Sequence, residues 1–179
     1  LEGEDPTVPE YRLGLARIRI NLGNALEIVG KWAEAEEQLR QGLATSEKLV
    51  SEYPALPEYR RILAMGHAKL GNLLLATGKP VEAEKQARLG QTHREKIATD
   101  FPTVAEYRAE LAMGHTEMGE LLRTLGRKTD AIEQQRKGLA ILEKLVSEYP
   151  TVPFNRYLLV INLDRMGAVA APTKKAKDF

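Results

Sequence analysis

The chain repeats itself every 48 residues, and this period limits the folds that it can adopt. A period of this length is typical of arrays in which each unit buries its apolar face against its neighbours. The predicted units span residues 7–54, 55–102 and 103–150, and a partial unit spans 151–171. The residues that recur in all four positions are Pro6, Pro54, Pro102 and Pro150; Gly23, Gly71, Gly119 and Gly167; and Arg12, Arg60, Arg108 and Arg156.

Each complete unit has the pattern of two helices. Apolar residues in the first helix recur at three- and four-residue spacings and share one stripe: Leu15, Ile18, Leu22, Ala25, Leu26 and Val29. Gly30 and its counterparts Gly78 and Gly126 are predicted to end that helix, because glycine adopts the left-handed C′ conformation without a Cβ penalty. Thr7 with Glu10, and Thr103 with Glu106, have the spacing of a capping box. We therefore expect seven helices, paired as antiparallel hairpins.

Glycines also recur inside the predicted helices, as Gly23 and Gly42 and their counterparts. A glycine in the middle of a helix costs about 1 kcal/mol relative to alanine. Close approach of two helix backbones compensates for that cost, because no Cβ atom keeps them apart. These glycines therefore predict tight helix pairs.

One set of residues resembles the signature of the tetratricopeptide repeat family: Leu22, Gly23, Leu26, Gly30, Ala35, Leu39 and Gly42. The match returns, without the Leu39 position, as Leu70, Gly71, Leu74, Gly78, Ala83 and Gly90 and as Met118, Gly119, Leu122, Gly126, Ala131 and Gly138. The early Trp of the signature is Arg19, His67 and His115 here. The resemblance implies an all-α, right-handed superhelical solenoid of helix hairpins. The lengthened repeat is similar to arrays appended to bacterial serine/threonine kinases, which implies a fragment of a larger multidomain protein.

The resemblance also implies a concave groove, lined by the first helices, that binds a peptide or protein segment. The predicted groove residues are Arg17, Asn21, Asn24, Lys69, Asn72, Glu117, Glu120, Arg123 and Arg165, with Met113, Thr116 and Asp164 among their neighbours. Family members that hold the C-terminal carboxylate of a chaperone have Lys where this chain has Ile20. We therefore do not expect a carboxylate clamp.

Composition excludes several other classes of function. The 26 basic and 25 acidic residues give a net charge of +1, which does not favour nucleic acid, and Glu27, Glu117 and Glu120 oppose an RNA-binding groove. The chain has no cysteine and no apolar run of about 18 residues, so we expect no thiolate metal site and no membrane span. No phosphate loop or nucleophile elbow is present.

Three histidines and one set of arginines have alternative interpretations. His67 and His115 could centre a metal- or small-molecule-binding regulatory domain, but a third ligand is missing, so we interpret them as partly buried interhelix residues. His93 is interpreted as a surface residue. The repeated arginines are expected to pair with acids near the loops rather than form a basic rim, and the candidate acids are Glu52, Asp100 and Glu148.

The two ends of the sequence suggest incomplete units. Residues 1–6 align with residues 49–54, where a second helix closes, and residues 172–179 are predicted to be a disordered tail. The helix predicted after Pro150 has no partner helix, so it either continues into further repeats or mediates self-association. The sequence thus predicts a cytoplasmic, non-catalytic protein-interaction scaffold without metal or cofactor.

Overall fold

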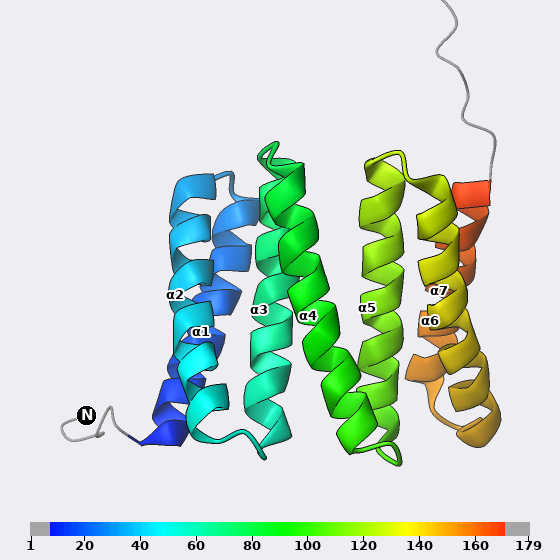
Figure 1. Cartoon of the computed structure of the whole chain (residues 1–179), viewed down its shortest axis with the longest axis horizontal. Coiled ribbons are helices and arrows are strands. Elements are labelled where there is room, and N and C mark those ends of the chain that lie inside the picture. The colour runs from blue at the N-terminus through cyan, green and yellow to red at the C-terminus, as the bar shows by residue number, and fades with distance from the viewer. Residues whose placement is uncertain (1–7, 171–179) are drawn as a thin grey trace, which may run out of the picture. The chain divides into compact units, whose positions relative to one another are not determined.

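The computed structural model describes residues 8–170, and within that range every regular element is an α-helix (Figure 1). The chain divides between Phe101 and Pro102 into two compact units, the first holding α1 to α4 and the second α5 to α7. The predicted tail lies outside the described residues. The helices are α1 (Pro9–Ile28), α2 (Trp32–Glu52), α3 (Pro57–Ala76), α4 (Pro80–Asp100), α5 (Ala105–Thr124), α6 (Lys128–Glu148) and α7 (Pro153–Ala170).

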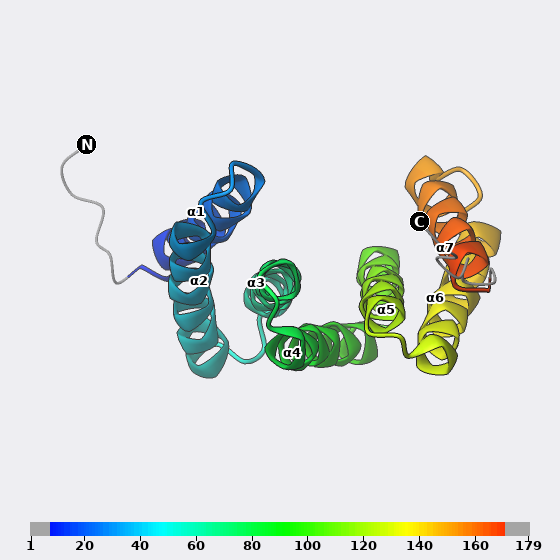
Figure 2. The ribbon, with the colours of Figure 1, turned by 90° about the horizontal axis from the view of Figure 1, so that it is seen from above.

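Consecutive helices pack as pairs, as the repeat predicts. In the first unit α1 pairs with α2 and α3 with α4, and α3 also packs against α1 and α2. In the second unit α5 pairs with α6, and α7 packs against both (Figure 2). The predicted all-α array of helix pairs is therefore confirmed.

The helix ends follow from glycine and proline. Gly30, Gly78 and Gly126 have φ angles of 79°, 76° and 77°, which confirms the predicted left-handed ends. After α1, the backbone N–H of Lys31 donates to the carbonyl of Leu26 at 2.9 Å, and this bond satisfies a carbonyl that the helix leaves unpaired. The same arrangement ends α3 and α5.

The predicted capping box of Thr103 and Glu106 is wrong. The residue before α5 is Val104, not Thr103, and no side chain caps the helix. The residue before α1 is Val8, again without a side-chain cap, and Thr7 lies outside the described residues. In α1 a proline holds the first helical position, where its fixed φ starts the helix and its missing N–H leaves one donor fewer to satisfy. Ala105 holds that position in α5.

Glycine permits the close packing within each pair, as predicted. A Cβ atom at Gly23 of α1 would lie 2.6 Å from Cγ of Leu39 in α2, and one at Gly42 of α2 would lie 2.8 Å from Cγ1 of Ile20. Each helix therefore presents a glycine to a branched side chain of the other. In the second pair, a Cβ at Gly90 would lie 3.0 Å from the carbonyl oxygen of Ala64.

The apolar stripe of the first helices is buried in α3 but not in α1. Leu63 and Leu70 of α3 are 2% and 1% exposed, because α1 and α2 cover them. Their counterparts Leu15 and Leu22 are 46% and 45% exposed. Among the described residues, only α2 and α3 pack against α1, so its opposite face meets no helix. The buried face of α1 instead consists of Leu13, Ala16, Ile20 and Gly23.

A buried polar cluster joins the three helices of the second unit. Asn162 of α7 is 0% exposed, and its Nδ2 donates to Oγ1 of Thr116 at 2.8 Å and to Oε1 of Gln135 at 3.0 Å. Apolar side chains, among them Leu142 and Leu158, form the core nearby. Because buried polar groups require partners, these bonds favour one seating of α7 on α5 and α6.

Two of the four repeated arginines form the predicted ion pairs. Arg12 donates to Glu52 at 2.9 Å, and Arg108 donates to Glu148 at 2.6 Å. The prediction is wrong for Arg60, which instead donates to the carbonyl of Pro54 at 3.4 Å. In that unit the acid is Asp100, whose side chain is one methylene shorter than glutamate and pairs with Lys96.

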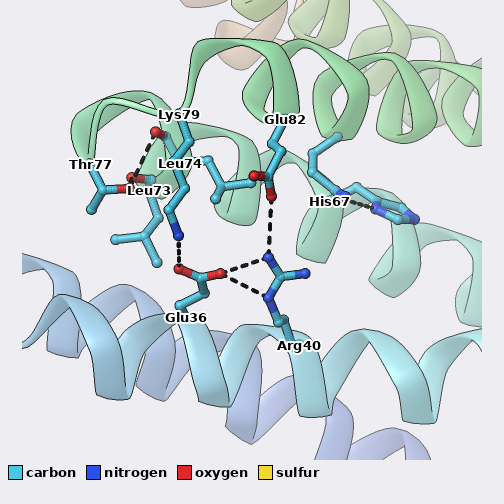
Figure 3. Close-up of polar contacts among 9 residues, drawn as sticks. Glu36, Arg40, His67, Leu73, Leu74, Thr77, Lys79 and Glu82 are labelled. Atoms are coloured by element: carbon cyan, nitrogen blue, oxygen red, sulfur yellow. Dashed lines mark hydrogen bonds and ion pairs between the residues drawn. The ribbon is translucent and has the colours of Figure 1, made fainter.

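Ion pairs also connect the two hairpins of the first unit. Glu36 of α2 accepts hydrogen bonds from Lys79, just before α4, at 2.9 Å and from Arg40 at 2.6 Å (Figure 3). Arg40 lies 3.6 Å from Glu82 of α4. The hydrogen bond from Lys79, followed by that from Arg40, lowers the pKa of Glu36, so the carboxylate remains charged at neutral pH.

Candidate functional site

A pocket of about 200 Å³ lies in the second unit, between the first helix of the third hairpin and the last helix. Helix α5 and helix α7 form its walls, and α6 contributes one residue. The lining residues are Met113, Thr116 and Glu117 from α5, Leu142 from α6, and Phe154, Tyr157, Leu158, Ile161 and Arg165 from α7.

The pocket combines an apolar lining with charged members of both signs. Leu142 and Leu158 are buried in the core, whereas the rings of Phe154 and Tyr157 are 52% and 60% exposed. These two rings stack with their centroids 6.4 Å apart. Exposed aromatic rings beside an apolar hollow are typical of sites that bind another apolar group.

Further charges lie along the same helices. Nε of Arg123 donates to Glu120 at 3.1 Å, and this bond is the main cause of the lowered pKa of Glu120. The positive charge of Arg165, which lines the pocket, lowers that pKa further. The carboxylate of Glu120 is therefore ionised at neutral pH and lies within electrostatic reach of the pocket arginine.

The structure brings only some of the predicted groove residues together at this pocket. Glu117 and Arg165 line it, and so do Met113 and Thr116. Glu120 and Arg123 pair with one another. Five predicted residues belong to the first unit: Arg17, Asn21 and Asn72 are exposed, and Asn24 and Lys69 are half-buried.

Among those five, Arg17 of α1 forms an ion pair with Glu58 of α3 at 3.5 Å.

Four pocket residues were not predicted from the sequence: Phe154, Tyr157, Leu158 and Ile161. The available signal was the pair of aromatic residues at a three-residue spacing near the start of α7.

The histidines are arranged as pairs with glutamine, not as a metal centre. His67 is 4% exposed with Nδ1 at 2.7 Å from Oε1 of Gln86, and His115 is 8% exposed with Nδ1 at 2.8 Å from Oε1 of Gln134. Both are buried between helices, as predicted. Within residues 8–170, no three His, Asp or Glu side chains gather closely enough to hold a metal ion.

The interpretation of His93 as a surface residue is wrong. His93 is half-buried, and its ring stacks on that of His67 with centroids 5.6 Å apart. Burial, followed by the nearby His67 and Arg60, lowers the pKa of His93 to about 4. Position 93 belongs to the second helix of the pair, and the sequence alone could not show that its side chain faces the first.

Comparison with known proteins agrees with this architecture. Residues 15–52, which form most of the first hairpin, match the tetratricopeptide repeat family. The fold is similar to the crystal structure of a TPR-like protein from Chlorobium tepidum TLS, with a TM-score of 0.58 at 17% sequence identity. That match covers 91% of this chain and 99% of the other. Curated proteins gave no significant match.

The chain therefore has a TPR-like fold of repeated helix pairs. Folds of this class generally mediate protein–protein interaction and are typically non-enzymatic. None of the helices in the described range is long and apolar enough to cross a membrane.

Proposed function

We propose that the chain is a non-catalytic protein-interaction module, and that the pocket between α5 and α7 holds a large apolar side chain of a bound peptide. The observation that carries the proposal is an apolar pocket whose lining includes two of the predicted groove residues, Glu117 and Arg165. The unit thus combines a predicted binding face with a hollow.

The size of the pocket supports an apolar side chain. A cavity of roughly 150 Å³ in another protein core is large enough to bind benzene. The present pocket, at about 200 Å³, has room for the side chain of a leucine, methionine or phenylalanine. Its lining includes Met113, whose flexible thioether adapts to side chains of different shape.

The charged members would orient the peptide around that anchor. Arg165 has several N–H donors for peptide carbonyls or a carboxylate, and the side-chain oxygens of Glu117 can accept from backbone N–H groups. The five predicted groove residues of the first unit, among them Asn24 and Lys69, extend the proposal to a second contact region for the same kind of ligand.

The proposal can be tested with a random peptide library displayed on phage, followed by fluorescence anisotropy of labelled hits. We expect the selected peptides to share one large apolar residue. Met113→Glu should weaken their binding at least about ten-fold, because it places a charge in an apolar pocket. Leu89→Glu is the control, since Leu89 is 38% exposed on α4, outside the helices that line the predicted groove.

Circular dichroism of both variants must first establish that they remain folded. Peptides that lack a shared apolar residue would contradict the proposal. Equal weakening by the two substitutions would also contradict it, because binding would then not depend on the pocket of the second unit.

A further inference from the structure

The exposed face of α1 carries apolar residues at a strict alternation of four- and three-residue spacings. We call this set the α1 stripe: Tyr11, Leu15, Ile18, Leu22, Ala25 and Val29. The five large members are well exposed: Tyr11 by 44%, Leu15 by 46%, Ile18 by 63%, Leu22 by 45% and Val29 by 67%. This spacing is the heptad pattern by which one helix packs along another.

Within the chain, the equivalent stripe of α3 is covered by the preceding hairpin. A preceding hairpin would have to rearrange its side chains to pack on α1 in the same way. In α3 the position equivalent to Ile18 is Gly66, where even a Cβ would lie 2.9 Å from Cδ2 of Leu43 and 3.0 Å from Cδ1 of Ile20. A branched side chain such as that of Ile18 would therefore require the side chains packed at this position to shift.

The last helix has a third residue at the equivalent position, and it does not relieve the conflict. Asn162 of α7 is accommodated by hydrogen bonds to Thr116 and Gln135. An isoleucine cannot make these bonds. The α1 stripe therefore fits a helix at the wider separation of a coiled coil better than another hairpin of the same kind.

We propose that the α1 stripe binds the α1 stripe of a second copy of this chain, with the two helices antiparallel. The order of side-chain sizes supports this pairing. A two-fold axis beside residue 20 places Tyr11 opposite Val29, Leu15 opposite Ala25, and Ile18 opposite Leu22 of the other copy. Tyrosine and leucine then face the smaller valine and alanine, and isoleucine faces the equally large leucine, whereas parallel pairing would place tyrosine opposite tyrosine and alanine opposite alanine.

The residues on either side of the α1 stripe carry few charges, which is compatible with pairing between two copies of the stripe. Its two flanks consist of Arg12, Arg19 and Leu26 on one side and Gly14, Asn21 and Ile28 on the other, with no acidic residue to recruit a basic partner. Arg12 is already paired with Glu52 of α2. The two copies of Arg19 would share one flank, so salt should strengthen the dimer slightly by screening them.

The outer face of α7 is the other place for self-association, because it exposes Phe154, Tyr157, Val160 and Leu163. These residues follow one another at three-residue spacing. Each step of three turns the side chain by about 60° around the helix, so the set winds through about half a turn. Such a set does not form a continuous seam along one partner helix, whereas the α1 stripe does.

Sedimentation equilibrium of the whole chain tests the proposal. We expect the unsubstituted chain to dimerise reversibly, and Ile18→Asp to raise the dissociation constant at least about ten-fold. Because Ile18 is 63% exposed, this substitution should leave the fold intact, as circular dichroism would verify. Val81→Asp is the matched control, since Val81 is 83% exposed on α4. The Val81→Asp chain should dimerise as the unsubstituted chain does.

A spin label tests the orientation. The chain contains no cysteine, so Glu10→Cys provides a single labelling site beside the stripe. An antiparallel pair centred on residue 20 separates the two labels by about 30 Å along the helix axis, at 1.5 Å for each residue. A parallel pair would bring them side by side.

Four results would overturn the proposal. They are a monomer at every concentration up to the solubility limit, equal loss of the dimer in the Ile18 and Val81 variants, labels that lie side by side, and a dimer that survives Ile18→Asp. In the last case, loss of the dimer on Val160→Asp would assign self-association to α7. The peptide-binding proposal concerns another unit and does not depend on these results.

Discussion

Two glycines in the same helix should respond to alanine with opposite signs. Gly14 and Gly23 both lie within α1. Apart from the adjacent residues and the backbone of the same helix, no heavy atom lies within 4 Å of a Cβ placed at Gly14. At Gly23 a Cβ would lie 2.6 Å from Cγ of Leu39 and 3.1 Å from the backbone carbonyl oxygen of Ala35. Leu39 is 0% exposed, so its branch point has little room to move.

The expected magnitudes follow from two opposing terms. Replacing glycine by alanine inside a helix contributes about 1 kcal/mol of stability. Overpacking a tight interface costs about 1 to 3 kcal/mol. Gly14→Ala should therefore raise the free energy of unfolding by about 1 kcal/mol, whereas Gly23→Ala should lower it by about 0 to 2 kcal/mol.

Urea unfolding followed by tryptophan fluorescence is the appropriate assay. The chain has a single tryptophan, Trp32, which begins α2 and so reports on the first hairpin. Far-ultraviolet circular dichroism measured on the same samples would identify any transition that the fluorescence misses. If the two variants changed the free energy of unfolding equally, the close approach of α1 and α2 at Gly23 would be refuted as the reason for that glycine.

Three further substitutions test other parts of the structure. The pKa of His93 is lowered from 6.5 to about 4, so protonation favours the unfolded chain. The free energy of unfolding should therefore fall as the pH drops from 6.5 to 4. His93→Gln should reduce this fall in urea titrations. Asn162→Ala leaves the buried hydroxyl of Thr116 without its donor and should cost about 1 to 3 kcal/mol in urea unfolding. Glu36→Gln should lower the free energy of unfolding by about 0.5 to 1 kcal/mol, and by less in high salt. Because the pKa of Glu36 is lowered from 4.5 by folding, its contribution to stability is present above pH 4.5 and is lost as the pH falls below that value.

Each of these has its own control. An unchanged pH profile in His93→Gln would mean that burial beside His67 does not govern the titration. Asn72→Ala, at an exposed position, should change stability little, and an equal loss there would remove the reason for assigning the effect to the buried cluster. A Glu36→Gln cost that is independent of salt would show that the ion pairs between α2 and α4 contribute nothing measurable.

The repeated elements were predictable because their causes are local. The left-handed turns at Gly30, Gly78 and Gly126 arise from the conformational freedom of glycine, and the sequence shows them directly. The close packing at Gly23 and Gly42 was also predictable, since a glycine inside a helix has a cost that packing compensates. The helix starts were missed by one residue because Val104, rather than the nearby threonine, precedes α5.

The candidate site was only partly predictable. Glu117 and Arg165 were expected at the groove, and both line the pocket. Phe154 and Tyr157 were missed because their role depends on α7 lying beside α5, which a repeat period does not specify. His93 was assigned to the surface because the rotation of α4 about its axis is set by its packing partner.

Neighbouring residues along the chain determine the helices and their turns, so each 48-residue copy produces the same local structure. Whether an apolar side chain is covered is a different matter, because it depends on the helix beside it. Leu22 and Leu70 occupy equivalent positions, yet one is 45% exposed and the other 1%. Burial removes a side chain from water only where another surface meets it, and that surface belongs to residues far away along the chain.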